Sequence, residues 1–595
     1  MRGSRTVALA AAFAGALGMA YLILPAMGSD LAAQVARADF FAAHGPTPID
    51  LRWYGGVQQF GYSLLAQPVM ALLGVRLTGA LALVAAATAF AALLVRTRMP
   101  RPLLGSLVGV ATIAGNLVSG RVTYGLGVAF GLAALLALTW RPAPAAGPHG
   151  ARAAIRPGGA DTRSGRDQPR VALFPVAEPA DGAGGWARLA LAGAGGWTRL
   201  AQAGAGGWTR LALAGAGALL ASAISPVAGL FVGLAGVALL LSRRYADGLV
   251  LAVAAALPLG ATAVLFGDGG WMNISRTDTI RATVTALLVA ALVGYRPVRI
   301  GALLAAGGVV AAALVHTPVG LNATRLAAMF ALPLLAAAAR RPSWPARLPS
   351  QPARRPGPAQ RPARRGMAAV ALAVLLVAVC WWQPPVVPAD LRSIGDPTSD
   401  PGYFAPLRAE LDRRGLNGRL EVPPTRNYWE SARLGDVPLA RGWLRQADID
   451  RNPLFFTTVP GAAGTGVPLT AESYRAWLDE NAVQYVAVPD APLSWVGRAE
   501  AELVVAGLPY LTEVWSERRW RLYAVAEPRP LVGPPGELHR VDGASITFHA
   551  SRSGPVPVRI RHSRWLIASG GATVAPGGDW TVVTVPRAGT YTLGS

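Results

Sequence analysis

Three carboxylates share one polar segment near the start of the chain. Asp30, Asp39 and Asp50 lie between the first two long apolar runs, and Asp30 directly follows the first of them. Acidic residues near a membrane are costly and tend to mark functional sites, and the first 384 residues contain only ten of them. A carboxylate can accept the proton of a hydroxyl nucleophile. The segment is therefore a place where such chemistry could occur.

Isolated arginines elsewhere in the apolar part of the chain could bind an anion. Arg325 begins one apolar run, Asn322 precedes it by about one helical turn, and Arg121 lies in a very short link between two other runs. Helix N-termini bind anions, and an arginine fork can hold a phosphate with paired hydrogen bonds. A phosphate site is one interpretation of these residues. The alternative is that both arginines extend toward lipid head groups.

The residues of the first polar segment also have structural explanations. Asp30 could cap a helix expected at about residues 31–43 instead of acting in catalysis. Asp39 and Asp50 could be solvated or structural. His44 could be a cation at the C-terminal end of that helix, where the helix dipole would stabilise it.

Eleven apolar runs could span a membrane and hold these side chains in place. A spanning helix needs about 20 apolar residues, or somewhat fewer where the bilayer is thinned. The first run could be a cleavable signal peptide, but it has no clear cleavage-type ending, and we interpret it as a retained anchor. The runs lie at residues 7–27, 77–95, 102–118, 122–140, 205–223, 226–242, 246–265, 280–295, 300–316, 325–339 and 367–384.

The distribution of charge predicts how these runs cross the membrane. The formal net charge of +23 lies entirely in the first 384 residues, which hold 33 Arg and 10 acidic residues. With the N-terminus in the cytoplasm, the inner segments carry 26 Arg and the outer ones 7, as the positive-inside rule requires. The charge is therefore topological, and no nucleic-acid partner is expected. We predict a multi-pass plasma-membrane protein whose outer loops lie at residues 28–76, 119–122, 266–279 and 316–324.

The composition of two inner segments predicts linkers. Residues 141–181 and 340–366 are rich in Pro, Arg, Ala and Gly, a composition that cannot bury a core. An 11-residue repeat with Trp186, Trp197 and Trp208 follows the first linker. It could form an interfacial helix or could reflect a recent tandem duplication, and we favour the duplication.

The last part of the chain has a different composition. Residues 385–595 hold 22 Arg and 22 acidic residues and no further spanning run, so we predict a soluble region. The odd number of predicted spans makes this region extracytoplasmic. Helical and apolar-strand patterns alternate over residues 385–529 and indicate an α/β domain. Short alternating runs at 530–595 predict a small β-sandwich-like domain. The predicted fold is thus mainly α, with a transmembrane helical bundle of about 11 helices at 1–384 followed by these two domains.

Short motifs follow one another along the segment that contains the three carboxylates. The acidic residue after the first run precedes a surface helix, a Gly45-Pro46 turn, a Trp53-Tyr54-Gly-Gly segment and Tyr62-Ser-x-x-x-x-Pro68 at the start of the next helix. This order resembles the membrane glycosyltransferases of the GT-C superfamily. Three further segments are similar to GT-C-like polytopic proteins, namely Gly120-Arg-Val-Thr-Tyr-Gly-Leu-Gly-Val-Ala-Phe-Gly, Ser225-Pro-Val-Ala-Gly and Thr317-Pro-Val-Gly-Leu-Asn-Ala-Thr-Arg-Leu.

The resemblance implies transfer of a sugar, with inversion, from a polyprenyl-phosphate donor to a cell-envelope glycan or lipid acceptor on the outer face. In such enzymes the first-loop carboxylate acts as general base or holds a divalent metal ion, and cationic side chains hold the lipid phosphate. Asp30 takes the carboxylate position. Its neighbour is Ser29 where many members of the superfamily have a second acid, which puts a metal in doubt, although Asp39 or Asp50 could replace that acid. No cofactor is certain, and a divalent metal ion is possible.

The resemblance and the residue types together give one set of candidate site residues. Asp30 is the candidate catalytic residue. The candidate substrate-binding residues are Arg325, Asn322, Arg121, Asp39, His44, Asp50 and Tyr54.

Two other classes of function remain as alternatives. A transporter or flippase of envelope lipids or polysaccharides would predict inverted repeats and acidic residues at mid-membrane, and the sequence shows neither. A non-catalytic assembly factor would use the outer region for binding and Asp30 only as a cap. Zinc hydrolysis and ATP-driven transport have little basis, because the six His are scattered, Cys380 is the only cysteine, and no Walker motif occurs.

Overall fold

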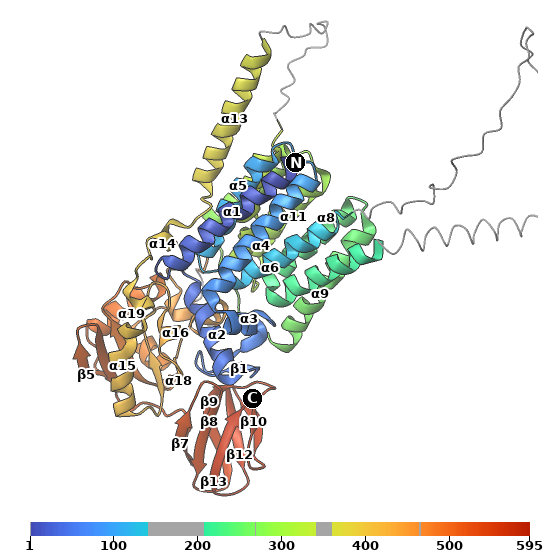
Figure 1. Cartoon of the computed structure of the whole chain (residues 1–595). Coiled ribbons are helices and arrows are strands. Elements are labelled where there is room, and N and C mark those ends of the chain that lie inside the picture. Colours follow the sequence, from blue (N-terminus) through green and yellow to red (C-terminus); the bar gives the residue numbers. More distant parts are fainter. Residues whose placement is uncertain (1, 141–206, 268, 341–359, 463–465) are drawn as a thin grey trace, which may run out of the picture.

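The structure is a computed structural model that describes residues 2–140, 207–267, 269–340, 360–462 and 466–595. The first predicted linker, most of the second, and Trp186 and Trp197 of the repeat lie outside these residues. Figure 1 shows a bundle of long helices with the β-containing parts of the chain gathered at one end. The predicted class, a helical membrane bundle followed by a β-rich region, is confirmed.

Each of the eleven predicted spans contains a helix in its described part. In the part of the chain that the structure describes, six helices are long and apolar enough to cross a membrane, and four others are shorter apolar helices. The chain is therefore a multi-pass membrane protein, whereas the number of crossings stays a prediction. The helices are α1 (Arg2–Ile23), α4 (Val75–Arg96), α5 (Pro102–Val118), α6 (Val122–Ala137), the helix Gly207–Ile224, α8 (Pro226–Leu241), α9 (Tyr245–Leu265), α10 (Arg276–Leu292), α11 (Arg296–Leu314), α12 (Arg325–Ala338) and α13 (Gln360–Trp382).

Small residues let the helices of the bundle approach closely. α4 packs against α1, α5 and α6, and α8 packs against α9. At the α8–α9 crossing, a Cβ on Gly236 would lie 2.8 Å from the backbone nitrogen of Ala252, and a Cβ on Gly248 would lie 2.6 Å from the Gly236 carbonyl oxygen. Close backbone contact of this kind is typical of helices that associate in membranes.

One helix differs from the prediction in its length and its position. α13 begins at Gln360, inside the segment predicted as a linker, because the Ala and Arg residues there favour a helix. It leans away from the bundle and contacts α12 (Figure 1). Its exposed apolar side chains, including Val370, Val374 and Trp381, suit a lipid environment.

The polar segment between α1 and α4 lies along one end of the bundle. The predicted surface helix is present as α2 (Leu31–His44). It is followed by a short antiparallel hairpin in which Ile49 pairs with Gln58, by the 3-10 helix η1 (Gln59–Gly61) and by α3 (Ala66–Leu73). The two strands of the hairpin are β1 (Ile49–Asp50) and β2 (Val57–Gln58).

After α13, the chain forms a four-stranded sheet with helices packed around it. The strand order is β3-β4-β6-β5, with β3 parallel to β4 and the other pairs antiparallel. The strands are β3 (Arg419–Glu421), β4 (Val483–Pro489), β5 (Leu511–Glu517) and β6 (Trp520–Val525). The helical elements are α14 (Pro388–Leu391), η3 (Pro397–Ser399), α15 (Pro401–Arg414), α16 (Glu430–Arg433), α17 (Arg445–Arg451), η4 (Pro453–Phe455), α18 (Ala471–Glu480) and α19 (Trp495–Val505).

Two further antiparallel sheets follow, with strand orders β10-β13-β8-β7 and β11-β12-β9. Their apolar side chains share one core, which also takes in Ile49 and Leu51 from the hairpin near the N-terminus. The boundaries predicted at residues 384 and 529 stay predictions. The strands are β7 (Gly536–Val541), β8 (Ser545–Ala550), β9 (Gly554–Arg561), β10 (Ile567–Ala568), β11 (Thr573–Gly577), β12 (Trp580–Val585) and β13 (Gly589–Gly594).

The loops predicted to be outer loops contact the region that follows α13. The Asn273 amide donates to the Pro460 carbonyl oxygen, and the Gln446 amide donates to the Pro318 carbonyl oxygen. At the end of α9, Trp565 stacks on Phe266 with ring centroids 5.4 Å apart. These loops therefore share one end of the bundle, while the side of the membrane that this end faces stays a prediction.

Candidate functional site

Asp30 lies between two arginines that come from distant parts of the sequence. Its Oδ2 atom is 3.3 Å from Nε of Arg121 and 3.4 Å from Nη2 of Arg325. The residue is buried, with 7% of its surface exposed. It occupies the N-cap position of α2, but its side chain makes no capping hydrogen bond there. The capping role considered for Asp30 is therefore not the one observed, and the carboxylate faces the arginines instead.

Two glycines allow the turn that carries Asp30 to touch the turn that carries Arg121. Gly28 has φ +101°, and a Cβ there would lie 2.3 Å from the Val118 carbonyl oxygen. Gly120 has φ +75°, and a Cβ there would lie 2.4 Å from the backbone nitrogen of Leu31. Only glycine combines such dihedral angles with so close a contact. The contact fixes the distance between Asp30 and Arg121.

Arg325 reaches Asp30 from the first turn of α12. The 3-10 helix η2 (Gly320–Thr324) precedes it and contains Asn322, which is buried. The guanidinium carbon of Arg325 lies 5.4 Å from the ring centroid of Tyr124 on α6, a cation–π distance. Tyr124 thus forms one wall of the site that Asp30, Arg121 and Arg325 share.

Four residues near the site were not predicted from the sequence. Gln34 on α2 accepts a hydrogen bond from Thr123, three positions after Gly120, through its Oε1 atom. Arg37 lies 4.0 Å from the ring centroid of Tyr62. Asp30, Gln34 and Arg37 are spaced by four and three residues, so a helix places them on one face, and this spacing was a signal that the sequence contained. The four residues are Gln34, Arg37, Tyr62 and Tyr124.

Two buried polar atoms at this site have no hydrogen-bond partner within the described part of the chain. They are the Nε2 atom of Gln34 and the hydroxyl of Tyr124. Gln34 is fully buried, and Tyr124 is 1% exposed. A buried donor without a partner costs about 1–3 kcal/mol. Both groups are therefore available to a polar ligand.

An apolar cavity of about 300 Å³ opens inside the bundle beside these residues. Helices α4, α6, α8, α10, α11 and α12 line it. Tyr124 and Leu326 form its lining next to Arg325, and Thr97, Arg244 and Tyr295 line it at the opposite end of the bundle. The cavity thus runs along the bundle and meets the cationic site at Tyr124. Its lining is suited to a hydrocarbon chain.

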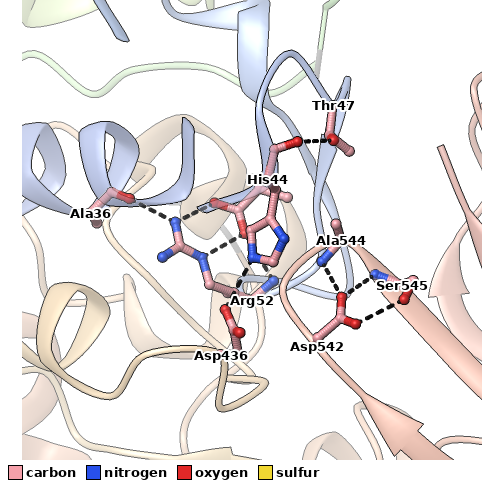
Figure 2. Close-up of polar contacts among 9 residues, drawn as sticks. Ala36, His44, Thr47, Arg52, Asp436, Asp542, Ala544 and Ser545 are labelled. Carbon is pink, nitrogen blue, oxygen red and sulfur yellow. Dashed lines mark hydrogen bonds and ion pairs between the residues drawn. The ribbon is translucent and has the colours of Figure 1, made fainter. Parts of the chain in front are cut away.

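Asp50 does not join this site. Its carboxylate forms a buried ion pair with Arg52, in which Oδ2 lies 2.8 Å from Nη2 and Oδ1 lies 2.9 Å from Nε. Arg52 also donates to the Ala36 carbonyl oxygen at 2.8 Å (Figure 2). Although burial alone would lower it, the pKa of Arg52 is raised because the Asp50 carboxylate stabilises the charged guanidinium. Asp50 therefore ties the hairpin to α2.

Asp39 and His44 also lie apart from Asp30, for a geometric reason. Asp39 follows Asp30 by nine residues, which an α-helix turns into the opposite face, and its side chain is exposed. His44 follows by fourteen residues, about 21 Å along the helix, and its Nε2 atom lies 3.3 Å from Asp436 (Figure 2). Asp39 thus lies on the face of α2 opposite Asp30, and His44 lies at the far end of α2, next to a later segment of the chain.

Tyr54 uses its hydroxyl group in a structural bond. The hydroxyl donates to the Gly442 carbonyl oxygen at 2.6 Å, and the residue is buried. Burial raises the pKa of the Tyr54 phenol well above its usual value, so the group keeps the proton that it donates. The bond joins the first loop to the segment that follows β3.

The residues around Asp30 do not fit a divalent metal ion. Two guanidinium groups already face the carboxylate, and their positive charge opposes a second cation at the same place. In the described part of the chain, no three His, Cys, Asp or Glu side chains come together in a group that could hold a metal ion.

Comparisons with known proteins find remote similarities to solved structures. No protein-family model and no curated protein sequence matches the chain. The arabinofuranosyltransferase AftD from Mycobacteria is similar over 92% of this chain, with 15% identity and a TM-score of 0.43. ArnT from Cupriavidus metallidurans bound to undecaprenyl phosphate is similar over 88% of this chain and 99% of its own, with 12% identity and a TM-score of 0.41.

This chain spans 41% of the length of the AftD chain that it matches. A second ArnT structure, in the apo state, is similar over 89% of this chain with a TM-score of 0.37. The similarities are remote in sequence and cover most of this chain. AftD is an arabinofuranosyltransferase, and one of the two ArnT structures contains undecaprenyl phosphate.

Proposed function

We propose that the chain is a membrane glycosyltransferase that transfers a sugar from a polyprenyl-phosphate donor to a cell-envelope glycan or lipid acceptor. One observation carries the proposal. A buried carboxylate, Asp30, meets two arginines at the place where an apolar cavity reaches Tyr124. A lipid phosphate has the two parts that this arrangement suits, an anionic group for the arginines and a hydrocarbon chain for the cavity.

The proposed reaction uses Asp30 as a general base. The acceptor hydroxyl attacks the anomeric carbon of the donor sugar while Asp30 takes its proton. The bond between the anomeric carbon and the phosphate oxygen breaks, and the polyprenyl phosphate leaves with the electron pair. Arg121 and Arg325 stabilise the negative charge that the phosphate gains. Attack from the side opposite the phosphate inverts the configuration of the sugar.

The two arginines face both Asp30 and the place proposed for the donor phosphate. Without a donor, both guanidinium groups lie near the Oδ2 atom of Asp30, at 3.3 and 3.4 Å. A donor phosphate competes for the same guanidinium groups.

The neutral polar groups of the site are suited to sugar hydroxyls. The Gln34 amide and the Tyr124 hydroxyl are buried donors with no partner in the described part of the chain. Hydrogen bonds from such groups orient a sugar without adding charge. They complement the arginines, which interact with the phosphate.

We place the site on the outer face of the plasma membrane, with the N-terminus in the cytoplasm and the region after α13 outside. The excess of Arg in the segments predicted from the sequence to be inner ones supports this orientation. The loops that carry Asp30, Arg121 and Arg325 share an end with the region after α13, so all of these groups face the same compartment.

The proposal is tested by sugar transfer in membranes that contain the wild type or a variant. A panel of polyprenyl-phosphate sugars serves as donors, and envelope extracts serve as acceptors. We expect transfer by the wild type and a loss of roughly 10²- to 10⁴-fold in Asp30→Asn. Asp278→Asn is the matched control, because Asp278 is also an acid at the N-terminal end of a helix, α10, at the same end of the bundle.

Two results would contradict the proposal. Equal transfer by the wild type and Asp30→Asn would remove Asp30 as the base. No transfer with any donor would remove the glycosyltransferase activity and leave lipid transport or a role in assembly.

A further inference from the structure

The turn before Asp30 is held by a segment that follows the last spanning helix. Asp390, on α14, accepts a hydrogen bond from the backbone nitrogen of Ser29 through its Oδ1 atom at 3.0 Å. Ser393 accepts a hydrogen bond from the backbone nitrogen of Gly28 at 3.1 Å. The Ser393 hydroxyl also donates to the Asp390 carbonyl oxygen at 2.7 Å, so the two residues act together. Asp390 and Ser393 are buried.

A third hydrogen bond reaches the same turn from another direction. The indole nitrogen of Trp443 donates to the Ser29 carbonyl oxygen at 2.9 Å. The backbone nitrogen of Asp30 itself donates to the Ser119 carbonyl oxygen at 3.0 Å. The backbone of Ser29 is thus held at both its nitrogen and its oxygen, and the next nitrogen is held by the link between α5 and α6. These bonds leave the Asp30 backbone little freedom to move.

The segment that carries Trp443 is itself fixed in place. Arg441 donates from Nε to Oε1 of Glu421 at 2.8 Å and also bonds to Glu500, and all three side chains are buried. The Gly442 carbonyl oxygen accepts the hydroxyl of Tyr54. A Cβ on Gly442 would lie 2.5 Å from the Trp53 ring, so the two segments are in close contact. Trp443 therefore extends from a rigid support.

Asp390 contacts the backbone next to the proposed base, which a residue that only stabilises the fold would not do. Its Oδ1 atom bonds to the residue next to the proposed base, and this bond crosses 361 positions of the sequence. A displacement of about 1 Å at a reacting group can cost roughly 100-fold in rate. The position of Asp30 relative to Arg121 and Arg325 therefore depends on Asp390.

We propose that Asp390 is a positioning residue for Asp30, with Trp443 as its counterpart on the other side of Ser29. The inference rests on the proposed function, since it gives Asp390 a purpose in sugar transfer. Asp390 acts through the Ser29 backbone and does not touch the substrate. It has this role because its side-chain oxygen accepts the Ser29 N–H, so an amide oxygen at the same place can replace it.

The test combines two measurements on the full-length protein in membranes or detergent. Hydrogen exchange of a peptide that covers residues 26–31 reports the position of the turn without any need for activity. Transfer kinetics with the best donor of the panel report its use in catalysis. The variants are Asp390→Ala, Asp390→Asn and Trp443→Phe. Asp396→Ala is the matched control, because Asp396 is a buried acid of the same segment that bonds to the nearby Thr398 backbone and not to the turn.

We expect Asp390→Ala and Trp443→Phe to increase exchange at residues 26–31. We also expect Asp390→Ala to lower kcat about 10- to 100-fold with KM for the donor within about twofold, because the phosphate contacts stay intact. Asp390→Asn should recover most of the activity. Asp396→Ala should change neither the exchange of this peptide nor kcat.

The outcomes separate this inference from the proposed function. Unchanged exchange at 26–31 in Asp390→Ala would overturn the positioning role whether or not the protein transfers sugar. Increased exchange with unchanged kcat would show that the bond is structural, which also overturns the inference. Loss of activity in Asp390→Asn equal to that in Asp390→Ala would assign a role to the charge itself and overturn it as well. Failure of the wild type to transfer any sugar would overturn the proposed function, and with it the purpose assigned to Asp390.

Discussion

Oδ2 of Asp30 and Nη2 of Arg325 lie 3.4 Å apart although 295 positions of the sequence separate the two residues. α1 places Asp30 at one end of the bundle, and α12 begins at Arg325 at that same end. The contact needs both helices and the short link that carries Arg121. It therefore reports on the assembly of the whole bundle as well as on the chemistry at the site.

Arg325→Ala should weaken binding of the donor phosphate. Hydrogen bonds to charged groups contribute about 1.5–3 kcal/mol, so KM for the donor should rise about 10- to 100-fold. Arg325→Lys should recover part of this loss, since lysine keeps the charge but lacks the fork. Donor titration with the transfer assay measures the effect. Arg281→Ala on α10 is the control, and an equal KM in both alanine variants would contradict the phosphate role.

Gly120→Ala should destabilise the protein more than the same change at Gly74. Both glycines have positive φ, +75° and +84°, so both substitutions strain the backbone by about 1 kcal/mol. A Cβ at Gly120 would also lie 2.4 Å from the Leu31 nitrogen, whereas Gly74 has no atom within 4 Å of that position. Gly120→Ala should therefore lower the free energy of unfolding by more than Gly74→Ala does, and only Gly120→Ala should lose transfer activity. Equal midpoints of thermal unfolding in detergent would refute this.

Arg52→Ala should lower the free energy of unfolding by about 3–5 kcal/mol, because it leaves the buried Asp50 carboxylate without its partner. The pair Arg529 and Asp479 is the control. It has the same 2.8 Å distance, but the Arg529 side chain is 45% exposed. Arg529→Ala should cost less than about 1 kcal/mol, because water screens an exposed pair. Denaturant unfolding followed by tryptophan fluorescence measures both, and similar losses would contradict the role given to burial.

Stability should fall as the pH rises through the pKa of Glu430. Burial raises the pKa of this carboxyl group to about 7, although Thr425 donates hydrogen bonds to it. Between its unfolded pKa of about 4.3 and pH 7, the folded state holds a proton that the unfolded state has lost. The stabilisation from this group is therefore complete below about pH 4 and is lost as the pH rises to about 7.

Glu430→Gln should remove this dependence because glutamine does not titrate. The wild type should lose roughly 3 kcal/mol relative to the variant between pH 4 and pH 8. Other buried carboxyl groups titrate in both proteins, so the difference between the two unfolding curves is the relevant quantity. Parallel curves over this range would show that Glu430 does not titrate as described.

The sequence predicted the bundle and the encounter of Asp30 with Arg121 and Arg325 for one shared reason. Each residue stands at the end of an apolar run, and the parity of the runs assigns all three to the same side of the membrane. The length of the apolar runs and the distribution of Arg between them are local properties that can be read directly from the sequence. The catalytic and binding roles of these residues stay predictions.

The contacts of Asp39, His44, Asp50 and Tyr54 could not be predicted in the same way. The type of a polar residue near an apolar run does not show whether it lies at the site. Its position depends on the face of α2 that carries it or on the partner that it contacts. The partners of His44 and Tyr54 are Asp436 and Gly442, which come from segments about 390 positions later, whereas Asp50 pairs with the nearby Arg52. Asp390 and Trp443 belong to no recognisable motif, and only the tertiary structure brings them to Ser29.

The hydrogen bond between Ser29 and Asp390 also sets an order of events during biosynthesis. Asp30 leaves the ribosome long before Asp390, which follows Ser29 by 361 positions. The turn cannot reach its final geometry until the last helix is inserted and the segment beyond it is folded. In a nascent chain, the turn that carries Asp30 therefore lacks this hydrogen bond until translation has passed Asp390.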